Sequence, residues 1–168
     1  MIHYRFTKDA RILFVGINPH YGSDRRGVPF SNNKTFWYLL SDAGLILEGR
    51  DDLRDDAGLR RFYDRKFAGK YGLNIINIVD RPSVTASDLK EGEEKYGNRR
   101  LRRIVKEYSP AVVCFVGKVT FQKFSGTKNP KFGWNGKLFR SRVYVMHFPI
   151  RGKASIRVKE LKTVAKNV

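Results

Sequence analysis

Residues 11–37 read RILFVGINPHYGSDRRGVPFSNNKTFW, and the rest of the chain can be interpreted outward from this stretch. It opens with the apolar run Ile12–Val15, closed by Gly16, which is typical of a strand buried on both faces. Pro19 disfavours helix at the residue before it, so the Asn18 amide is presented from extended backbone. Helical spacing follows at Phe36, Leu39, Leu40 and Ala43. We therefore expect a strand, a polar loop and a helix, with Asn18 at the sheet edge where open α/β folds bind ligands.

The same order of strand, loop and helix recurs along the chain. Apolar and β-branched runs predict three more strands, over 72–79, 111–116 and 143–147. Helical spacing predicts helices over 51–67, 99–108 and 119–124, and a last one capped by Ser155 with Val158, Leu161, Ala165 and Val168 facing inward. The segment 125–138, rich in glycine, lysine and aromatic residues, is predicted to be an irregular loop. The alternation predicts an α/β fold: a single domain over residues 1–168, a three-layer α/β/α sandwich with a central, mainly parallel four-stranded sheet.

The chain is strongly basic. Its 168 residues carry 34 Lys and Arg against 16 Asp and Glu, a net charge of +18. Thirteen of these cations fall between Gly117 and Val168 with the single acid Glu160, so we expect one side of the molecule to be much more basic. A polyanion such as nucleic acid is the partner that this charge favours, with strongly salt-dependent binding. The alternative is a generally solvated basic surface, as heat-adapted or ribosome-associated proteins can have.

The sequence disfavours several other classes of protein. Cys114 is the only cysteine and lies in an apolar run, so we interpret it as an inert core residue in a reducing compartment. One cysteine and the scattered His3, His20 and His147 supply no ligand set for a metal, and no cofactor is predicted. No apolar run reaches membrane-spanning length, and the first residues do not resemble a signal peptide. We expect a soluble intracellular monomer without membrane contact, cytoplasmic and nucleoid-associated if its source is prokaryotic.

Three predicted strands end near residues with amide or imidazole side chains: Asn18, Asn77 and His147. Right-handed crossovers bring the carboxyl ends of parallel strands to one edge of a sheet, so these side chains should gather there. That convergence is the physical argument for a site. Each residue also has a purely structural interpretation, in which its side chain only satisfies nearby backbone groups.

Five pieces of the sequence, in order and at similar spacing, resemble the mismatch-specific uracil/thymine-DNA glycosylases of the uracil-DNA glycosylase superfamily. They are Gly16-Ile17-Asn18-Pro19, Pro29-Phe30 with Phe36-Trp37, Lys70-Tyr71-Gly72-Leu73 with Asn77-Ile78-Val79-Asp80-Arg81-Pro82, Tyr108-Ser109-Pro110 and Gly117-Lys118. The resemblance runs from about Arg11 to Phe124 and is fainter beyond. It implies a monofunctional enzyme that flips a base out of DNA and hydrolyses its N-glycosidic bond without a metal, leaving an abasic site for base excision repair.

The resemblance also implies roles for individual residues. Asn18 would hold the attacking water; since an amide is a weak base, the rate would come from water positioning and from stabilisation of the departing base anion. Phe30 would stack on the extruded base, unless it is a core residue under the loop. Asn77 would read the pyrimidine edge, because an amide offers both a donor and an acceptor. Ile17 and His20 would line the same pocket, and His20 stands where the family has glycine.

The sequence differs from the family at the last family motif. After the fourth predicted strand it reads His147-Phe148-Pro149-Ile150-Arg151-Gly152-Lys153, and only Pro149 aligns cleanly. His147 resembles the histidine that contacts the carbonyl of the leaving base in other branches of the superfamily. Arg151 or Ile150 would fill the hole left by the flipped base. The cations predicted to contact DNA are Lys118, Lys128, Lys131, Arg151 and Lys153.

The predicted partner is double-stranded DNA with a mismatched or deaminated base. Uracil is the first candidate, and thymine or another damaged base opposite guanine is the next; single-stranded DNA is a further candidate substrate. Two other functions stay open at this point. The altered last motif is compatible with a catalytically altered glycosylase-like nucleic-acid-binding module, and the charge alone is compatible with an RNA-binding or ribosome-associated protein.

Overall fold

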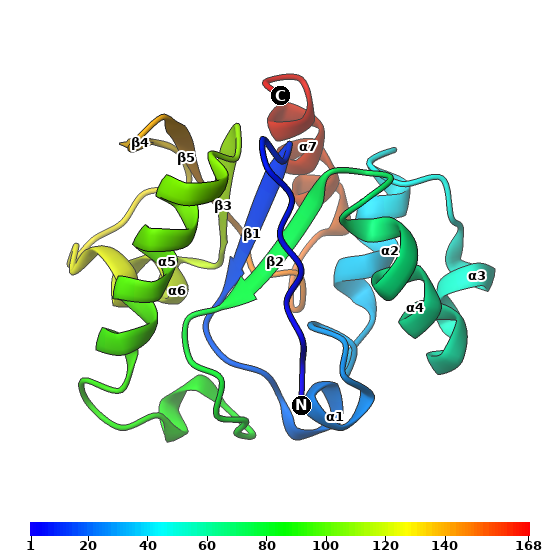
Figure 1. Cartoon of the computed structure of the whole chain (residues 1–168), viewed down its shortest axis with the longest axis horizontal. Coiled ribbons are helices and arrows are strands. Elements are labelled where there is room, and N and C mark those ends of the chain that lie inside the picture. The colour runs from blue at the N-terminus through cyan, green and yellow to red at the C-terminus, as the bar shows by residue number, and fades with distance from the viewer.

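The computed structural model describes residues 1–168, and a five-stranded sheet in the order β2-β1-β3-β5-β4 forms its centre (Figure 1). The strands are β1 (Ile12–Gly16), β2 (Leu73–Asn77), β3 (Val112–Val116), β4 (Gly133–Leu138) and β5 (Ser141–Met146). β1 pairs in parallel with β2 and β3, β3 pairs in parallel with β5, and only β4 is antiparallel. The predicted α/β fold with a mainly parallel sheet is confirmed, but the sheet has five strands and not four.

The additional strand, β4, lies in the segment predicted to be an irregular loop. It pairs with β5 at the edge of the sheet, and its register shifts between Trp134 and Lys137. Gly133 and Gly136 both have positive φ, and most of the strand is partly or fully exposed. An irregular edge strand of this kind lacks the buried apolar run that predicted the other four.

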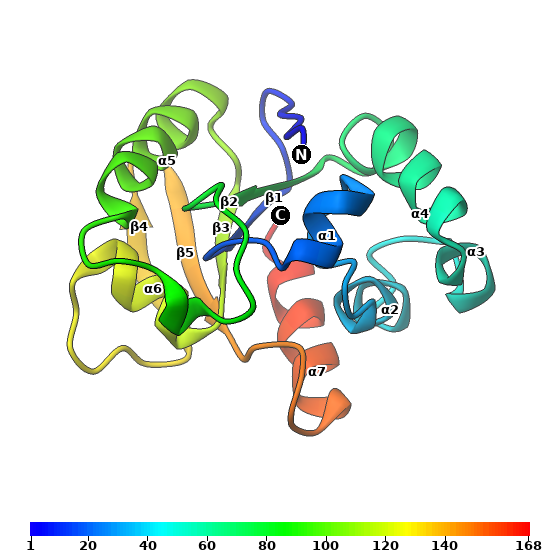
Figure 2. The ribbon, with the colours of Figure 1, turned by 90° about the horizontal axis from the view of Figure 1, so that it is seen from below.

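Helices cover both faces of the sheet and complete the three predicted layers (Figure 1 and Figure 2). On one face lie α2 (Thr35–Asp42), α3 (Arg50–Arg54), α4 (Asp56–Phe62) and α7 (Ala154–Ala165); on the other lie α5 (Glu94–Tyr108) and α6 (Lys118–Ser125). Successive strand residues point to opposite layers. Phe14 belongs to a cluster of 24 buried apolar residues on the first face, and Val15 to a cluster of 14 on the second. No helix has both the length and the apolar character needed to cross a membrane.

The single helix predicted over 51–67 is divided into parts. Asp55 has extended backbone between α3 and α4, and its side chain accepts a hydrogen bond from Gly58 N at 2.7 Å. It therefore caps α4, which continues into a π-helical turn, η1 (Tyr63–Phe67). The break was not predicted because an aspartate within a polar helical pattern fits the middle of a helix as well as a cap.

Two helices begin where the sequence did not predict. α5 begins at Glu94, earlier than expected, and includes Gly97. A Cβ at Gly97 would lie 1.7 Å from the carbonyl oxygen of Ile78, so only glycine lets α5 approach the chain that leaves β2. A 3₁₀ turn, η2 (Ala86–Asp88), lies in that connection. Lys153 occupies the N-cap position of α7 without a side-chain cap hydrogen bond, and Ser155, predicted to cap this helix, lies in its first turn.

The inward face of α7 also differs from the predicted one. Leu161 is fully buried as expected, but Val168 lies beyond the end of the helix and is exposed. Arg157 and Glu160 are buried although both carry charge. Because buried charges require polar partners, this face of α7 must meet polar groups as well as the apolar core.

The carboxyl ends of the four parallel strands meet along one edge of the sheet. This is the lower edge in Figure 1, and Figure 2 views the molecule from that side. Gly16 pairs with Asn77, and Val116 pairs with Met146. The short helix α1 (Tyr21–Arg26) follows β1 at the same edge. Since neighbouring strands lie about 4.8 Å apart, the ends of β1 and β5, with β3 between them, are separated by about 10 Å.

Candidate active site

Asn18 follows β1, and its side-chain amide is held in one orientation. Nδ2 donates to Ser83 Oγ at 2.7 Å, to Arg81 O at 3.2 Å and to Pro19 O at 3.4 Å. Two of these acceptors are backbone carbonyls, which cannot donate, so the nitrogen must be the atom that faces them. Ser83 gives its own proton to Thr85 O at 2.6 Å, which leaves its oxygen free to accept. The Oδ1 of Asn18 makes no hydrogen bond within the protein and is available to a water or a ligand.

The loop that holds Asn18 is itself braced by ion pairs. Arg81 binds the two carboxylate oxygens of Glu93, through Nε at 2.6 Å and Nη2 at 3.0 Å. The hydrogen bond from Arg81 lowers the pKa of the Glu93 carboxyl to about 2. Arg100 binds Asp80 in the same bidentate manner, at 2.6 and 2.9 Å. These pairs fix the position of the Arg81 carbonyl that accepts from Asn18.

Gly16, Phe30 and Asn77 lie close together at the carboxyl edge of the sheet. A Cβ at Gly16 would lie 2.3 Å from Asn77 Oδ1 and 2.8 Å from Phe30 Cζ, so only glycine lets the amide and the ring come together here. Asn77 is 3% exposed, and its amide lies beside the buried hydroxyl of Tyr4. The Asn77 amide therefore lies at the carboxyl edge of the sheet, next to the aromatic ring of Phe30.

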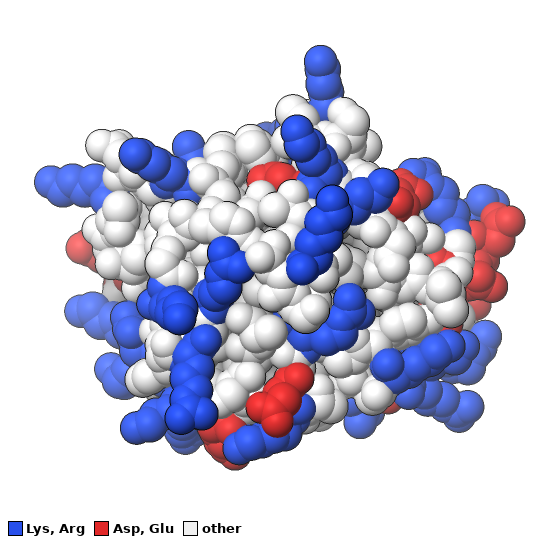
Figure 3. Space-filling view, turned by 90° about the horizontal axis from the view of Figure 1, so that it is seen from above, with Lys and Arg blue, Asp and Glu red and all other residues white.

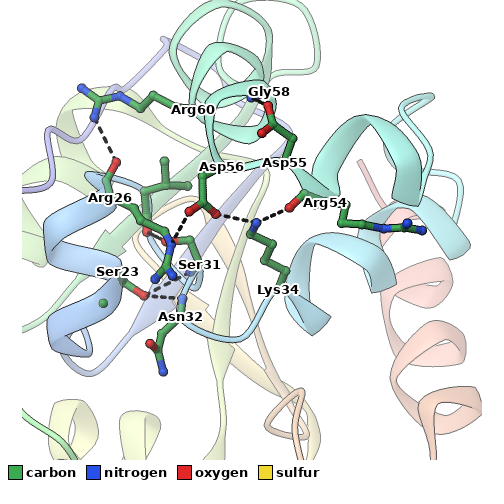
Figure 4. A network of polar contacts seen from close by, with 12 residues as sticks. Ser23, Arg26, Ser31, Asn32, Lys34, Arg54, Asp55, Asp56, Gly58 and Arg60 are labelled. Carbon is green, nitrogen blue, oxygen red and sulfur yellow. Dashed lines mark hydrogen bonds and ion pairs between the residues drawn. The ribbon is translucent and has the colours of Figure 1, made fainter.

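Phe30 has a strained backbone conformation. Its φ is +54°, which a bulky residue adopts rarely and keeps only where its surroundings enforce it. Ser23 provides part of that enforcement, because its Oγ accepts from the backbone N–H groups of Ser31 and Asn32 at 3.1 and 2.9 Å (Figure 4). On the other side, Trp37 Nε1 donates at 2.9 Å to the carbonyl of the residue before Phe30. The ring itself packs against Phe36 of α2, with centroids 4.6 Å apart, so it borders the core as well as the sheet edge.

Ion pairs extend this support to the neighbouring helix (Figure 4). Asp56, in the first turn of α4, pairs with Lys34 at 2.6 Å and with Arg26 at 3.1 Å. Lys34 also donates to the carbonyl of Arg54. Hydrogen bonds from Lys34, and then from Arg26, hold the pKa of the Asp56 carboxyl below its ordinary value. Since the two cations stand on either side of the loop that carries Phe30, the network ties this loop to α4.

His147 follows β5 and is fixed by Glu160 of α7. The carboxylate oxygen Oε1 accepts from the His147 backbone N–H and from ring Nδ1, both at 3.0 Å. An ionised carboxylate only accepts, so Nδ1 carries a proton and Nε2 is the free ring nitrogen. Phe132 stacks on the ring with centroids 3.5 Å apart, and Lys118 Nζ lies 4.2 Å from the Phe132 centroid. Nε2 can donate outward only when both ring nitrogens are protonated.

The sequence matches the model of a known protein family. The model of the uracil DNA glycosylase superfamily matches residues 3–157. The chain belongs to the uracil DNA glycosylase superfamily. Over 136 residues it is also 31% identical to a Schizosaccharomyces pombe protein named G/U mismatch-specific uracil DNA glycosylase. That match covers 76% of this chain and 39% of the relative, so the chain spans well under half of the relative's length.

In this superfamily member, the predicted site residues do not all touch one another. Phe30 and Asn77 meet at the end of β1, directly before Asn18. His147 lies on the same edge of the sheet but beyond β3, and no hydrogen bond joins it to these residues. The structure thus places these residues in two groups along the carboxyl edge of the sheet.

The two residues that flank the Asn18-Pro19 pair each accept a hydrogen bond within the protein. Ile17 is partly buried, and its carbonyl accepts from Val79 N at 2.8 Å, which prolongs the pairing of β1 with β2. His20 caps α1, where its Nδ1 accepts from Gly22 N at 3.0 Å. Only Nε2 of His20 is therefore left for a ligand. The cap explains how histidine is accommodated at a position where the resembling family has glycine.

The cations predicted to contact DNA are all exposed and lie near the site edge or on loops beside it. Lys118 begins α6, Arg151 and Lys153 lie in the loop after β5, and Lys128 and Lys131 lie between α6 and β4. Lys and Arg also cover the opposite end of the molecule, the end where the strands begin (Figure 3). Positive charge is thus spread over more than one face, although the sequence suggested a single basic side.

Two buried polar residues that the sequence did not single out support the site. Ser83, 3% exposed, orients Asn18, and Glu160, 8% exposed, orients His147. Nothing in the spacing marked Ser83. Glu160 could have been noticed in the sequence, because it is the only acidic residue after Gly117, in a segment that holds thirteen Lys and Arg. No group of three or more His, Cys, Asp or Glu is placed to hold a metal ion.

Proposed function

We propose that this chain is a monofunctional DNA glycosylase that flips uracil out of DNA, hydrolyses its N-glycosidic bond and leaves an abasic site for base excision repair. Membership of the superfamily supports the class of reaction, and the name of the S. pombe relative supports uracil opposite guanine as the first substrate. The observation that carries the proposal is the fixed amide of Asn18, whose Oδ1 is a free acceptor at the carboxyl edge of the sheet.

In the proposed reaction, Asn18 Oδ1 accepts a hydrogen bond from a water and aims the water oxygen at C1′ of the deoxyribose. The C1′–N1 bond breaks and its electron pair leaves with the base, while the water oxygen bonds to C1′ and gives up a proton to solvent. An amide is too weak a base to remove that proton early. The rate therefore comes from placing the water and from stabilising the charges that develop on sugar and base.

The flipped base would lie against Phe30 with its polar edge toward Asn77. Stacking on an aromatic ring contributes roughly 1–3 kcal/mol and is tolerant of base identity. Discrimination would come from the Asn77 amide, which can donate to a carbonyl and accept from an N–H of a pyrimidine. The braced, strained loop of Phe30 supports this role, because a pre-formed stacking surface costs little to order when the base arrives.

His147 would stabilise the negative charge on the departing base through Nε2. The Glu160 carboxylate accepts from Nδ1 at 3.0 Å, which fixes the orientation of the ring and places a negative charge beside it. The stacked Phe132 holds the ring plane, and Lys118, on the far side of Phe132, adds positive potential nearby. A cationic donor aimed at the leaving group contributes to the transition state and not to substrate binding alone.

DNA would be held by the exposed cations at the site edge. Lys118, Lys128, Lys131 and Lys153 would contact phosphates as point charges. Arg151 would enter the gap left by the flipped base, since its planar guanidinium can both stack and hydrogen-bond. Its φ of +67° and its exposed side chain in the loop after β5 support that role.

The test is release of uracil from a duplex with one U·G pair, measured as strand cleavage at alkali-labile abasic sites. We expect cleavage by the wild-type chain and none above background by Asn18→Ala. Parallel substrates with U·A and T·G pairs, and single-stranded DNA with uracil, establish base and strand preference. Binding to every lesion without cleavage would favour the catalytically altered binding module, and binding to RNA alone would favour the RNA-binding function.

A further inference from the structure

Arg157 is a buried arginine that serves the loop 148–153. It is 5% exposed, and it lies one turn into α7, the helix that begins where this loop ends. Its guanidinium donates to three backbone carbonyls of the loop: to Phe148 through Nε at 2.9 Å, to Lys153 through Nη1 at 3.2 Å and to Arg151 through Nη2 at 3.3 Å. One side chain thus holds the beginning, the middle and the end of the same loop.

The usual partner of a buried arginine is absent here. None of the ion pairs of the chain involves Arg157. Burying a guanidinium is costly unless its donors are satisfied, and in this case backbone carbonyls satisfy them. The apolar residues Leu161 and Val164 already anchor α7 to the core, so the helix does not need a charge at this position for packing. The contacts of Arg157 therefore indicate that its role is to hold the loop 148–153 in one conformation.

The loop has a conformation that it would not adopt by itself. Arg151 has φ +67°, in the left-handed region that side chains other than glycine disfavour. The next residue, Gly152, lies so close to the guanidinium that a Cβ there would be 2.5 Å from Arg157 Nη1. The close approach requires glycine at this place, and the three hydrogen bonds offset the strain at its neighbour.

We propose that Arg157 is a positioning residue that holds the loop 148–153 in the shape from which Arg151 enters the base stack. This inference rests on the proposed glycosylase function and on the wedge role of Arg151. A loop ordered in advance avoids an entropy cost at the moment of base flipping. The benefit applies to duplex DNA, where a gap must be filled, and not to single-stranded DNA.

The first test compares Arg157→Met with Lys159→Met, which removes the same charge from an exposed position of α7. We expect Arg157→Met to lower single-turnover uracil release from duplex roughly tenfold and release from single-stranded DNA by less than twofold. Lys159→Met should leave the ratio of the two rates unchanged. Arg157→Lys, which keeps the charge but lacks the planar fork, should restore only part of the duplex rate.

A double-mutant cycle tests whether Arg157 acts through Arg151. If it does, adding Arg151→Ala to Arg157→Met should cause little further loss on duplex, because the wedge is already misplaced. Hydrogen–deuterium exchange of the free protein gives a readout that needs no activity: amides of 148–153 should exchange faster in Arg157→Met, while those of β1 and β3 should not change.

Three results would overturn the inference: equal losses on duplex and single strand, additive losses in the cycle, or unchanged exchange in the loop. If Arg157→Met does not fold, the same comparison of duplex and single-stranded rates and of loop exchange is made with Arg157→Lys, which keeps the charge but not the planar fork. A wild-type chain that releases no uracil would refute the proposed function alone. Faster exchange confined to the loop would then still establish Arg157 as the residue that orders it.

Discussion

Asn77 and Asn74 are two buried amides on β2 with different surroundings. Asn74 is used within the protein, since its Oδ1 accepts from Thr7 N at 3.0 Å and its Nδ2 donates to Thr7 Oγ1 at 3.3 Å. The Asn77 amide makes no such pair of hydrogen bonds and lies beside the Tyr4 hydroxyl and the Phe30 ring, at the end of β1. The two asparagines can thus be compared with each other: Asn74 has a structural role, and Asn77 is proposed to recognise the base.

We predict that Asn77→Ala reduces discrimination between uracil and other pyrimidines by roughly tenfold, because one lost hydrogen bond to a buried polar edge is worth about 1–3 kcal/mol. Affinity for undamaged duplex should change by less than twofold. Release rates on a panel of lesions measure the effect. Asn74→Ala is the control and should lower stability without changing base preference; a uniform loss of activity in Asn77→Ala on all bases would contradict the reading role.

Glu160 offers a second residue-level prediction. Glu160→Gln keeps an acceptor for His147 but removes the negative charge beside its ring. We expect the variant to lose roughly tenfold in uracil release, and clearly less with 5-fluorouracil, whose anion leaves more easily and needs less stabilisation. Single-turnover rates on the two bases check this. Equal losses would mean that Glu160 only supports the fold at the end of β5.

Residues at the ends of strands could be proposed as site residues from the sequence, and their supporting partners could not. Asn18, Asn77 and His147 follow apolar runs that are easy to see. Ser83 is 65 positions from Asn18, and its contact depends on the path of the loop after β2. Arg157 was overlooked because a charged residue is assigned to the solvent side of a helix by default.

The loop between β2 and α5 is the element that sets the Asn18 amide, and its stability should depend on pH. The Arg81 hydrogen bond lowers the pKa of Glu93 from its ordinary value of 4.5 to about 2. A carboxyl whose pKa is lower in the folded than in the unfolded protein stabilises the folded state at any pH above its unfolded-state pKa. That contribution is lost as the pH falls from about 4.5 towards 2. The ion pair is partly exposed, so its contribution is modest.

We predict that Glu93→Gln lowers the melting temperature slightly at pH 7 and that the difference from wild type shrinks as the pH falls below 4.5. Thermal unfolding at several pH values measures this. Glu91→Gln is the matched control, because Glu91 is exposed and forms no ion pair, and it should leave the melting temperature unchanged. A Glu93→Gln difference that persists undiminished at the lowest pH would rule out the charge as its cause.

Elements with continuous apolar runs could be predicted from the sequence, and irregular ones could not. β1, β2 and β3 are buried on both faces, and their residues indicate this directly. β4 forms because it can pair with the free edge of β5. Its two glycines with positive φ interrupt the sequence pattern by which a strand is recognised. The proposed helix over 51–67 was correct in type, but Asp55 ends one helix and caps the next.

At the scale of the whole molecule, a net charge of +18 predicts tight, salt-sensitive DNA binding. If the four lysines proposed to contact phosphates each neutralise one, the slope of log K against log salt should be roughly −4. We predict that Lys153→Ala reduces the magnitude of that slope by about 1. Titrations of a labelled duplex between low and moderate salt measure it.

Basic side chains on the opposite end of the molecule make a control necessary (Figure 3). Lys70 is exposed and lies before the start of β2, at the end of the sheet away from the site. Lys70→Ala should leave the slope unchanged. If Lys70→Ala and Lys153→Ala have equal effects, DNA binds without preference for the site edge, which would contradict the proposed orientation.

The central claim is that the Asn18 amide positions the water that attacks C1′. The most direct test is the single-turnover rate of uracil release from a U·G duplex at saturating protein, for wild type and Asn18→Ala. Affinity is measured in parallel on the same duplex with a 2′-fluorinated uridine, which resists hydrolysis. We predict that Asn18→Ala loses at least about 100-fold in rate and less than about threefold in affinity. Undiminished release, or a loss that lies entirely in affinity, would contradict the claim.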